Sequence, residues 1–197
     1  MASASSVETE IKLRVPDPAS ARGLIERNGF SVSVERVFES NVIYDTADTA
    51  FRRRGELVRI RTIRPAAGQT GDGRSTLTFK GAAVPGRHKT RPELETSLSD
   101  AAPLETVFDR AGLGPVFRYE KYRTEYRRKG GDGVVTLDET PIGAFLELEG
   151  SPAWIDETAR ELGFKDSDYV LSSYAALYFE YCRERGVQPS DMVFPPA

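Results

Sequence analysis

Apolar and polar residues alternate along much of this chain, most regularly near its start. Between residues 7 and 15 every second side chain is apolar or threonine, and the intervening ones are Glu8, Glu10, Lys12 and Arg14. Side chains of a β-strand point to opposite faces in turn. The pattern therefore predicts a strand with one apolar face and one ionised face.

Seven further segments show strand patterns bounded by glycine, proline or polar clusters. They cover residues 34–44, 57–64, 76–80, 91–98, 116–128, 134–140 and 144–149. The segments between them read as a turn at 45–48, loops at 65–75 and 81–90, and a hairpin turn at 130–133. The 65–75 loop holds three glycines, which predicts a flexible connection.

Capping residues predict four helices. Asp17-Pro18 and Ser151-Pro152 place a side-chain cap before a proline at the first helical position, with ends predicted near Gly29 and Gly163. Another helix is predicted over 100–111, and a fourth begins after Ser172 or Ser173. We interpret the tyrosines of the fourth helix, at 174, 178 and 181, as packing residues.

These elements predict an α+β fold: an eight-stranded antiparallel closed β-barrel with helices packed on its outside. We expect a single domain over residues 1–197, with a core at about 7–182 and an irregular, proline-containing tail at 183–197. Helices on the outside must cover the apolar faces of the strands. The ionised faces would then line the interior of the barrel.

Charge and composition narrow the function classes. The chain has 27 Lys and Arg against 30 Asp and Glu, a net charge of -3, which argues against a nucleic-acid partner. It holds no run of about 18 apolar residues, so we expect no membrane partner, and the first six residues do not resemble a signal peptide. A single cysteine favours a cytoplasmic location. The length, charge and composition of the chain are compatible with a homodimer.

Standard catalytic motifs are missing. The one histidine, His88, excludes histidine-based zinc sites, and we interpret it as a solvated loop residue. The chain has no GxSxG and no phosphate-binding GxxxxGK[ST] sequence. Any catalysis must come from carboxylates, lysine, arginine and a metal ion.

Ionised residues of both signs recur on the predicted inner faces. The acids are Glu8, Glu10, Glu93, Glu95, Glu125, Asp138, Glu147 and Glu149. The bases are Lys12, Arg59, Arg61, Lys80, Arg91, Lys121, Arg123 and Arg127. Solvent-facing strands with surface ion pairs explain any single strand, but facing charges inside a barrel are costly unless they bind something. Carboxylates bind hard divalent cations, and Arg and Lys bind phosphate, so the set suits a metal complex of a polyanion.

The order of these motifs resembles the CYTH family, also called triphosphate tunnel metalloenzymes. The marker is Glu-x-Glu-x-Lys at Glu8, Glu10 and Lys12, followed by Tyr44-Asp45-Thr46. Further matching segments are 57–61, 77–81, 91–95, 121–123, 137–138, 145–149 and 173–174. The chain departs from the family pattern at Ala47, where proline is frequent, and it has no lysine after Cys182.

The resemblance implies a tunnel that binds a triphosphate-containing small molecule together with Mg²⁺ or Mn²⁺. It implies metal ligation by Glu8, Glu10 and Glu149, with Glu147 and Asp138 binding a metal or orienting its water. Phosphate would be bound by Lys12, Arg59, Arg61, Lys80, Lys121 and Arg123. The catalytic set would be Glu8, Glu10, Lys12, Asp138 and Glu149. The roles of Glu93, Glu95, Arg91 and Arg127 stay open between a second metal and charge balance.

Three functions remain in competition. A metal-dependent triphosphatase would hydrolyse inorganic triphosphate, thiamine triphosphate or a nucleoside triphosphate. A class IV adenylyl cyclase, a lyase, would use the ribose 3′-hydroxyl in place of water and form cyclic AMP and pyrophosphate. A non-catalytic protein would only bind polyphosphate or a nucleotide. We favour hydrolysis, because a base-independent substrate needs fewer recognition groups and the sequence identifies no adenine pocket.

Overall fold

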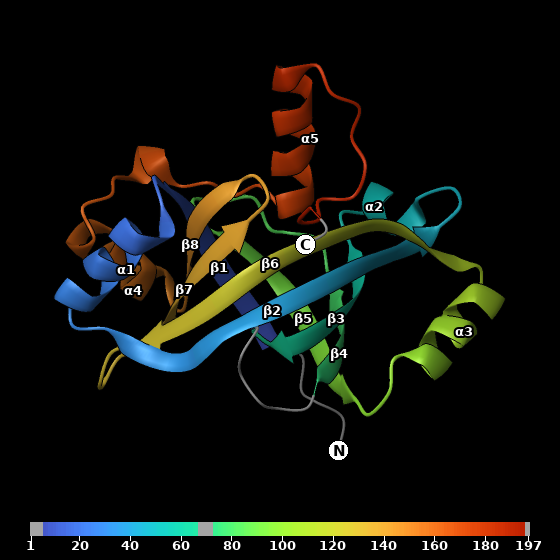
Figure 1. Ribbon diagram of the computed structural model, residues 1–197, viewed down its shortest axis with the longest axis horizontal. Helices are drawn as coiled ribbons and strands as arrows, with labels where there is room; N and C mark the ends of the chain where they lie inside the picture. The colour runs from blue at the N-terminus through green and yellow to red at the C-terminus, as the bar shows by residue number, and fades with distance from the viewer. Residues whose placement is uncertain (1–5, 67–72, 196–197) are drawn as a thin grey trace.

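The strands, each with one ionised and one apolar face, close into a barrel. The computed structural model describes residues 6–66 and 73–195 (Figure 1). The strands are β1 (Ser6–Val15), β2 (Ser31–Thr46), β3 (Leu57–Pro65), β4 (Arg74–Lys80), β5 (Lys89–Leu98), β6 (Leu113–Arg127), β7 (Val134–Thr140) and β8 (Gly143–Glu149). They are ordered β1-β5-β4-β3-β2-β6-β7-β8, and β8 pairs with β1 to close the sheet. The predicted eight-stranded antiparallel barrel is confirmed.

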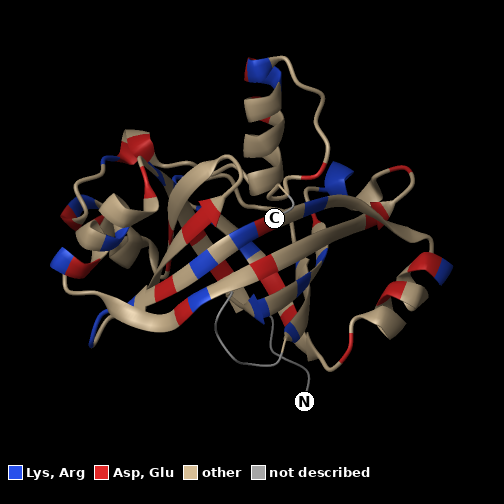
Figure 2. Cartoon of the chain, in the orientation of Figure 1, with Lys and Arg blue, Asp and Glu red and all other residues tan. Residues whose placement is uncertain are grey.

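Strand register determines which ionised residues become neighbours. On β1 and β8, Glu10 lies opposite Glu149 and Lys12 lies opposite Glu147. Directly opposed residues share one face of the sheet, so these four side chains point into the barrel together. Figure 2 shows acidic and basic residues following one another along β2 and β6.

Helices cover the outside of the barrel. They are α1 (Pro18–Arg27), α2 (Ala50–Arg53), α3 (Ala102–Arg110), α4 (Pro152–Glu161) and α5 (Tyr174–Arg185), with a 3-10 turn η1 (Asp166–Asp168). As predicted, side chains cap three of them: Asp17 accepts from Ser20 N–H, Ser151 from Trp154 N–H and Ser173 from Ala176 N–H. In the described residues no helix has the length and apolar character needed to cross a membrane.

Three apolar clusters join helices to strands. The largest includes Ile11, Leu146 and Tyr126 of the barrel with Ile25 of α1 and Ile155 of α4. A second packs α5 onto inward-facing residues of β6 and β8 at one end of the barrel, and a third packs α3 and the α2 region onto the outer faces of β2 and β3. Figure 1 shows α1 and α4 together on one side of the barrel and α3 on the other. With the apolar faces covered, the ionised faces are left to the interior.

Several elements differ from the predicted ones. The segment after β2, expected as a turn, contains α2, because the Asp45 carboxylate accepts the backbone N–H groups of Phe51 and Arg52 at 3.0 Å each. Strands β2 and β6 are longer than predicted, since their pairing continues through Thr46 and Leu113. Of the loop expected at 65–75, residues 67–72 lie outside the described residues, as do 1–5 and 196–197.

The C-terminal segment is irregular as predicted, but it is anchored. Helix α5 runs to Arg185, three residues past the expected core boundary. Beyond it Met192 is fully buried, and its backbone bonds to Arg118 O and Glu120 N–H at 2.9 Å each. The tail therefore pairs with the edge of β6 through a parallel bridge between Met192 and Tyr119.

Candidate functional site: a charged tunnel

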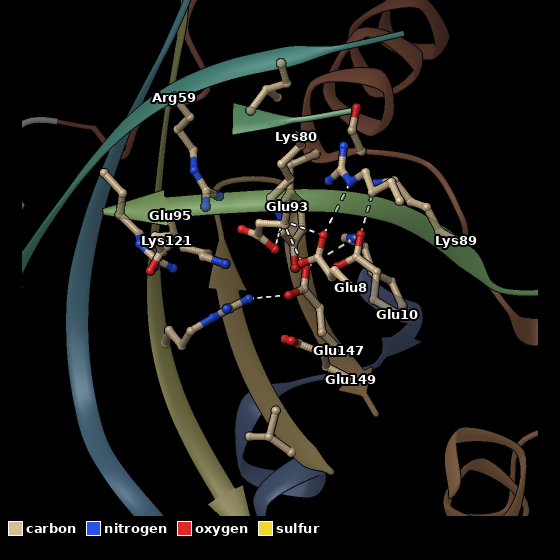
Figure 3. Close-up of a pocket in the computed structure, with 18 of the residues that line it drawn as sticks. Glu8, Glu10, Arg59, Lys80, Lys89, Glu93, Glu95, Lys121, Glu147 and Glu149 are labelled. Carbon is tan, nitrogen blue, oxygen red and sulfur yellow. Dashed lines mark hydrogen bonds and ion pairs between the residues drawn. The ribbon is translucent and has the colours of Figure 1, made fainter. Parts of the chain in front are cut away.

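The barrel encloses a cavity of about 370 Å³ that is lined mainly by ionised side chains (Figure 3). Seven carboxylates and nine cations line it. The acids are Glu8, Glu10, Glu93, Glu95, Glu125, Glu147 and Glu149. The bases are Lys12, Arg59, Arg61, Lys80, Lys89, Arg91, Lys121, Arg123 and Arg127. The structure thus brings together every predicted inward-facing residue except Asp138, and it adds Lys89.

Lys12 lies between two acids on neighbouring strands. Its Nζ is 3.2 Å from a carboxylate oxygen of Glu10 and 3.2 Å from one of Glu147. Burial alone would raise the pKa of both carboxyls, but Lys12 outweighs it and holds both well below the usual range. The same pairs overcome burial and raise the pKa of Lys12. All three groups are therefore ionised at neutral pH.

A second ion-pair group lies where β1, β4 and β5 meet. Lys80 Nζ donates to both carboxylate oxygens of Glu8 at 2.6 Å and lies 3.3 Å from Glu93. Arg91 adds a contact to Glu8 at 3.3 Å. Burial, partly offset by Lys80, raises the pKa of Glu93. In this structure Glu93 and Arg91 therefore balance the charges of Lys80 and Glu8.

Glu149 differs from the other acids of β1 and β8. Its carboxylate makes no side-chain hydrogen bond or ion pair within residues 6–66 and 73–195, and the residue lines the cavity while remaining exposed to solvent. The enclosing wall and the nearby carboxylates of Glu8 and Glu147 raise the pKa of Glu149 to about 7. Negative charge is therefore in local excess around this group.

Asp138 points into the barrel but does not line the cavity, because other side chains cover it. It is fully buried and accepts from Lys121 Nζ at 2.9 Å, from Arg123 at 2.6 and 2.7 Å, and from the Tyr174 hydroxyl at 2.7 Å. Its two oxygens are thereby used on cations that do line the cavity. Arg123 also pairs with Glu147. Asp138 thus holds Lys121 and Arg123 in place, and its binding of a metal or of a metal's water stays a prediction.

The β2–β3 side of the tunnel contains groups that the sequence interpretation did not select. Glu39 is almost fully buried, 3.6 Å from Lys121 and 3.8 Å from Arg61. Burial would raise the pKa of Glu39, but Lys121 and its neighbouring cations lower it to about 2. Arg59 donates to the Tyr119 hydroxyl at 3.1 Å and to Thr78 at 3.3 Å. These contacts fix the inner cations of the wall.

One end of the tunnel is formed by the start of α5. Ser173, Tyr174 and Ala175 line the cavity there, with Tyr119 nearby. The Tyr174 ring lies 5.3 Å from Lys12 Nζ and 5.2 Å from Lys121 Nζ. Tyr174, predicted to be a packing residue, therefore also contacts the charged interior. At the other end Glu125 and Arg127 line the opening, and Glu95 pairs with Arg61 at 3.1 Å.

His88 is part of a separate polar cluster. Its Nε2 lies 2.8 Å from Asp156, which also accepts from the Tyr169 hydroxyl at 3.0 Å. The side chain is only 11% exposed, so the prediction of a solvated histidine is wrong. The contact ties the loop before β5 to α4.

The donor set fits a hard divalent cation, although its members are dispersed among basic partners. Within the described residues no three Asp, Glu, His or Cys side chains are arranged to hold a metal ion. Glu8, Glu10 and Glu147 are paired with Lys or Arg, whereas the unpaired Glu149 lies opposite Glu10 in the register. Oxygen ligands of this kind are those that Mg²⁺ and Mn²⁺ prefer. Glu8, Glu10, Glu147 and Glu149 are thus suitable ligands once their ammonium and guanidinium partners are exchanged.

Known proteins of similar sequence and structure share this barrel. A Methanocaldococcus jannaschii protein named "putative adenylate cyclase" is 28% identical over 79% of this chain and 83% of its own length. The solved structure of the PH1819 protein from Pyrococcus horikoshii has a TM-score of 0.72 and 27% identity, covering 88% of this chain and 99% of the other.

A third relative carries an activity in its description. It is a Hippeastrum protein described as a "putative adenylyl cyclase" that "reveals a dominant" triphosphatase activity, with a TM-score of 0.61, 19% identity and coverage of 92% and 97%. The model of the CYTH domain matches residues 6–174, from the first residue of β1 to the first residue of α5. The chain therefore belongs to the CYTH domain family.

Proposed function

We propose that the protein is a divalent-metal-dependent hydrolase of a triphosphate, with inorganic triphosphate, thiamine triphosphate and nucleoside triphosphates as the candidate substrates. The observation that carries the proposal is the tunnel lining, in which nine cations and seven carboxylates surround one cavity. A polyanion with its metal ion needs both kinds of group in one place. Family membership over residues 6–174 supports the same substrate class.

The cations divide into two sides of the tunnel. Lys121 and Arg123, oriented by Asp138, face Arg59 and Arg61 from neighbouring walls. Lys12 and Lys80 lie among the carboxylates of β1 and β8. A bound triphosphate chain would lie between these sides and take hydrogen bonds from several cations at once. Such positioning and charge neutralisation are the main contributions an enzyme makes to phosphoryl transfer.

The carboxylates would supply the metal site and position water beside it. Glu8, Glu10 and Glu149 would hold Mg²⁺ or Mn²⁺, with Glu147 beside them. When bound, the cation supplies positive charge at the phosphate oxygens and a Lewis-acidic centre. A carboxylate beside the cation would position the attacking water.

Adenylyl cyclase activity is the second candidate. Two relatives are named putative adenylate or adenylyl cyclases, and one of these is described as having dominant triphosphatase activity. Cyclisation would need a site that holds adenine and aligns the ribose 3′-hydroxyl with the α-phosphorus. The tunnel's two aromatic residues hydrogen-bond charged groups, Tyr119 with Arg59 and Tyr174 with Asp138, which favours phosphate over base recognition.

A product assay tests the proposal. The purified protein is incubated with Mg²⁺ or Mn²⁺ and, in turn, inorganic triphosphate, thiamine triphosphate and ATP, and phosphate, pyrophosphate and cyclic AMP are measured. We expect phosphate release that depends on the metal. Cyclic AMP with pyrophosphate from ATP would refute the hydrolase. Thermal stabilisation by triphosphate and metal without turnover would instead identify a binding protein.

A further inference from the structure

Lys89 is a largely buried cation that belongs to neither the proposed metal ligands nor the proposed phosphate ligands. It is the first residue of β5, lines the tunnel, and has a side chain that is 11% exposed. Its Nζ lies 2.9 Å from Glu10 (Figure 3). Within the described residues, no second carboxylate lies within 4.0 Å of this ammonium group.

Glu10 is shared unequally between two lysines. The same oxygen that accepts from Lys89 also accepts from Lys12 at 3.2 Å. Lys12 has a second partner in Glu147, also at 3.2 Å. If Glu10 turned toward a bound metal ion, Lys12 would keep an acid and Lys89 would lose its partner. An unpaired ammonium group in a cavity is costly, so Lys89 would then need another anion.

The surrounding backbone holds Lys89 at the tunnel. Lys89 lies opposite Glu10 in the β1–β5 register, so both side chains point to the same face. The residue before it, His88, is bonded to Asp156 of α4, and the residue after it, Thr90, pairs with Val84. The flexible four-carbon stem of lysine can redirect its head inside the cavity without moving this backbone.

We propose that Lys89 occupies the place of the divalent cation at Glu10 in the ligand-free protein and becomes a phosphate ligand when the cation binds. This inference rests on the proposed function, because it requires both metal and triphosphate in the tunnel. Lys89 and the metal then compete for one carboxylate, whereas Lys89 and the phosphates attract each other. Removing the ammonium group should therefore change the two affinities in opposite directions.

Calorimetry on the full chain tests this without turnover. Mn²⁺ is titrated alone, and a methylene-bridged, non-hydrolysable triphosphate is titrated in the presence of saturating Mn²⁺. We expect Lys89→Met to bind Mn²⁺ about tenfold more tightly and the triphosphate analogue about tenfold more weakly, the effect of one charged hydrogen bond. Lys89→Arg should stay close to wild type in both. Lys129→Met, at an exposed lysine outside the tunnel, controls for the loss of one charge.

The outcomes separate the two proposals. If Lys89→Met weakens both affinities, the residue supports the wall of the site and the inference is wrong; unchanged affinities refute it as well. If wild type binds no triphosphate analogue, the proposed function falls together with the inference. Circular dichroism checks folding, and Lys89→Gln, which keeps a donor to Glu10 without the charge, must show the same two directions if Lys89→Met does not fold.

Discussion

Glu10 and Glu149 face each other across β1 and β8 but lie in opposite electrostatic surroundings. Two ammonium groups, those of Lys12 and Lys89, hold Glu10 ionised. Glu149 has the carboxylates of Glu8 and Glu147 as neighbours, and its pKa is about 7. Two identical side chains at one register position therefore differ in how readily they accept a proton.

Glu10→Gln should abolish metal-dependent turnover and also destabilise the empty protein. The substitution removes a proposed metal ligand and leaves Lys89 without its acid, and breaking a buried ion pair from one side costs about 3 kcal/mol. Phosphate release and thermal melting in a chelator measure the two effects. Glu184→Gln, exposed on α5, is the matched control. Full activity of Glu10→Gln would remove this residue from the metal site.

Glu39 should make the stability of the barrel depend on acid pH. Its pKa is about 2 in the folded protein, below the ordinary value of 4.5. A depressed carboxyl pKa contributes stability that is present above pH 4.5 and is lost as the pH falls toward 2. Glu39→Gln should lower the free energy of unfolding at pH 7 by about 3 kcal/mol and flatten its pH dependence between these values. Urea unfolding at several pH values measures this; an unchanged acid dependence would contradict it.

At the scale of elements, α4 is positioned by a close contact with the β7–β8 pair. A methyl group added at Gly133 would lie 2.4 Å from the ring of Trp154, and one at Gly150 would lie 2.9 Å from it. Both glycines thus leave room for the indole at the ends of strands that carry Val134 and Glu149. The packing of α4 on the outside and the position of the tunnel opening are therefore linked.

Gly133→Ala should destabilise the protein through this contact. Overpacking of a tight site costs about 1–3 kcal/mol, which lowers the melting temperature of a chain of this size by roughly 2–4 °C per kcal/mol. Gly114→Ala is the control, since a methyl group there meets no atom within 4 Å. In a Trp154→Ala background, the Gly133 substitution should cost little more. An equal cost in both backgrounds would show that the indole is not the cause.

The sequence predicted elements and inner faces well where a strand alternates regularly. The alternation of apolar and ionised residues at 8–12 and 145–149 predicted an ionised inner face. The ionised residues of both segments line the tunnel in the structure. Lys89 was missed because it follows a loop rich in glycine, proline and basic residues, although it begins a strand.

Glu39 could have been found from the spacing of its strand. It lies two positions before Asn41 and four before Ile43, so the three side chains point to the same face. Asp138 shows what alternation cannot predict. Its side chain points inward, as its position in the strand predicts, but Lys121, Arg123 and Tyr174 cover it.

For the whole molecule, the tunnel is nearly balanced in charge, as the chain is. The chain has a net charge of -3; nine cations and seven carboxylates line the cavity, and the buried carboxylates of Glu39 and Asp138 contact three of these cations. Most of the interior acids are paired with cations, so the empty barrel tolerates its charges by internal neutralisation. A ligand must replace these pairs with contacts at least as good. A long polyanion with its metal can do so along the tunnel, whereas a small anion can satisfy only part of it.

Inorganic triphosphate with Mg²⁺ should therefore stabilise the protein more than pyrophosphate with Mg²⁺ at equal concentration. A ligand at one hundred times its dissociation constant adds about 2.7 kcal/mol, which corresponds to roughly 5–10 °C in melting temperature for a chain of this length. Pyrophosphate has one phosphate fewer and should leave part of the cation set paired only with protein carboxylates. Thermal melting with each ligand measures the difference, and Arg59→Ala should reduce the triphosphate shift because it removes an inner cation. Equal shifts for the two ligands would mean that the tunnel recognises a single phosphate–phosphate unit, and the triphosphate assignment would then be wrong.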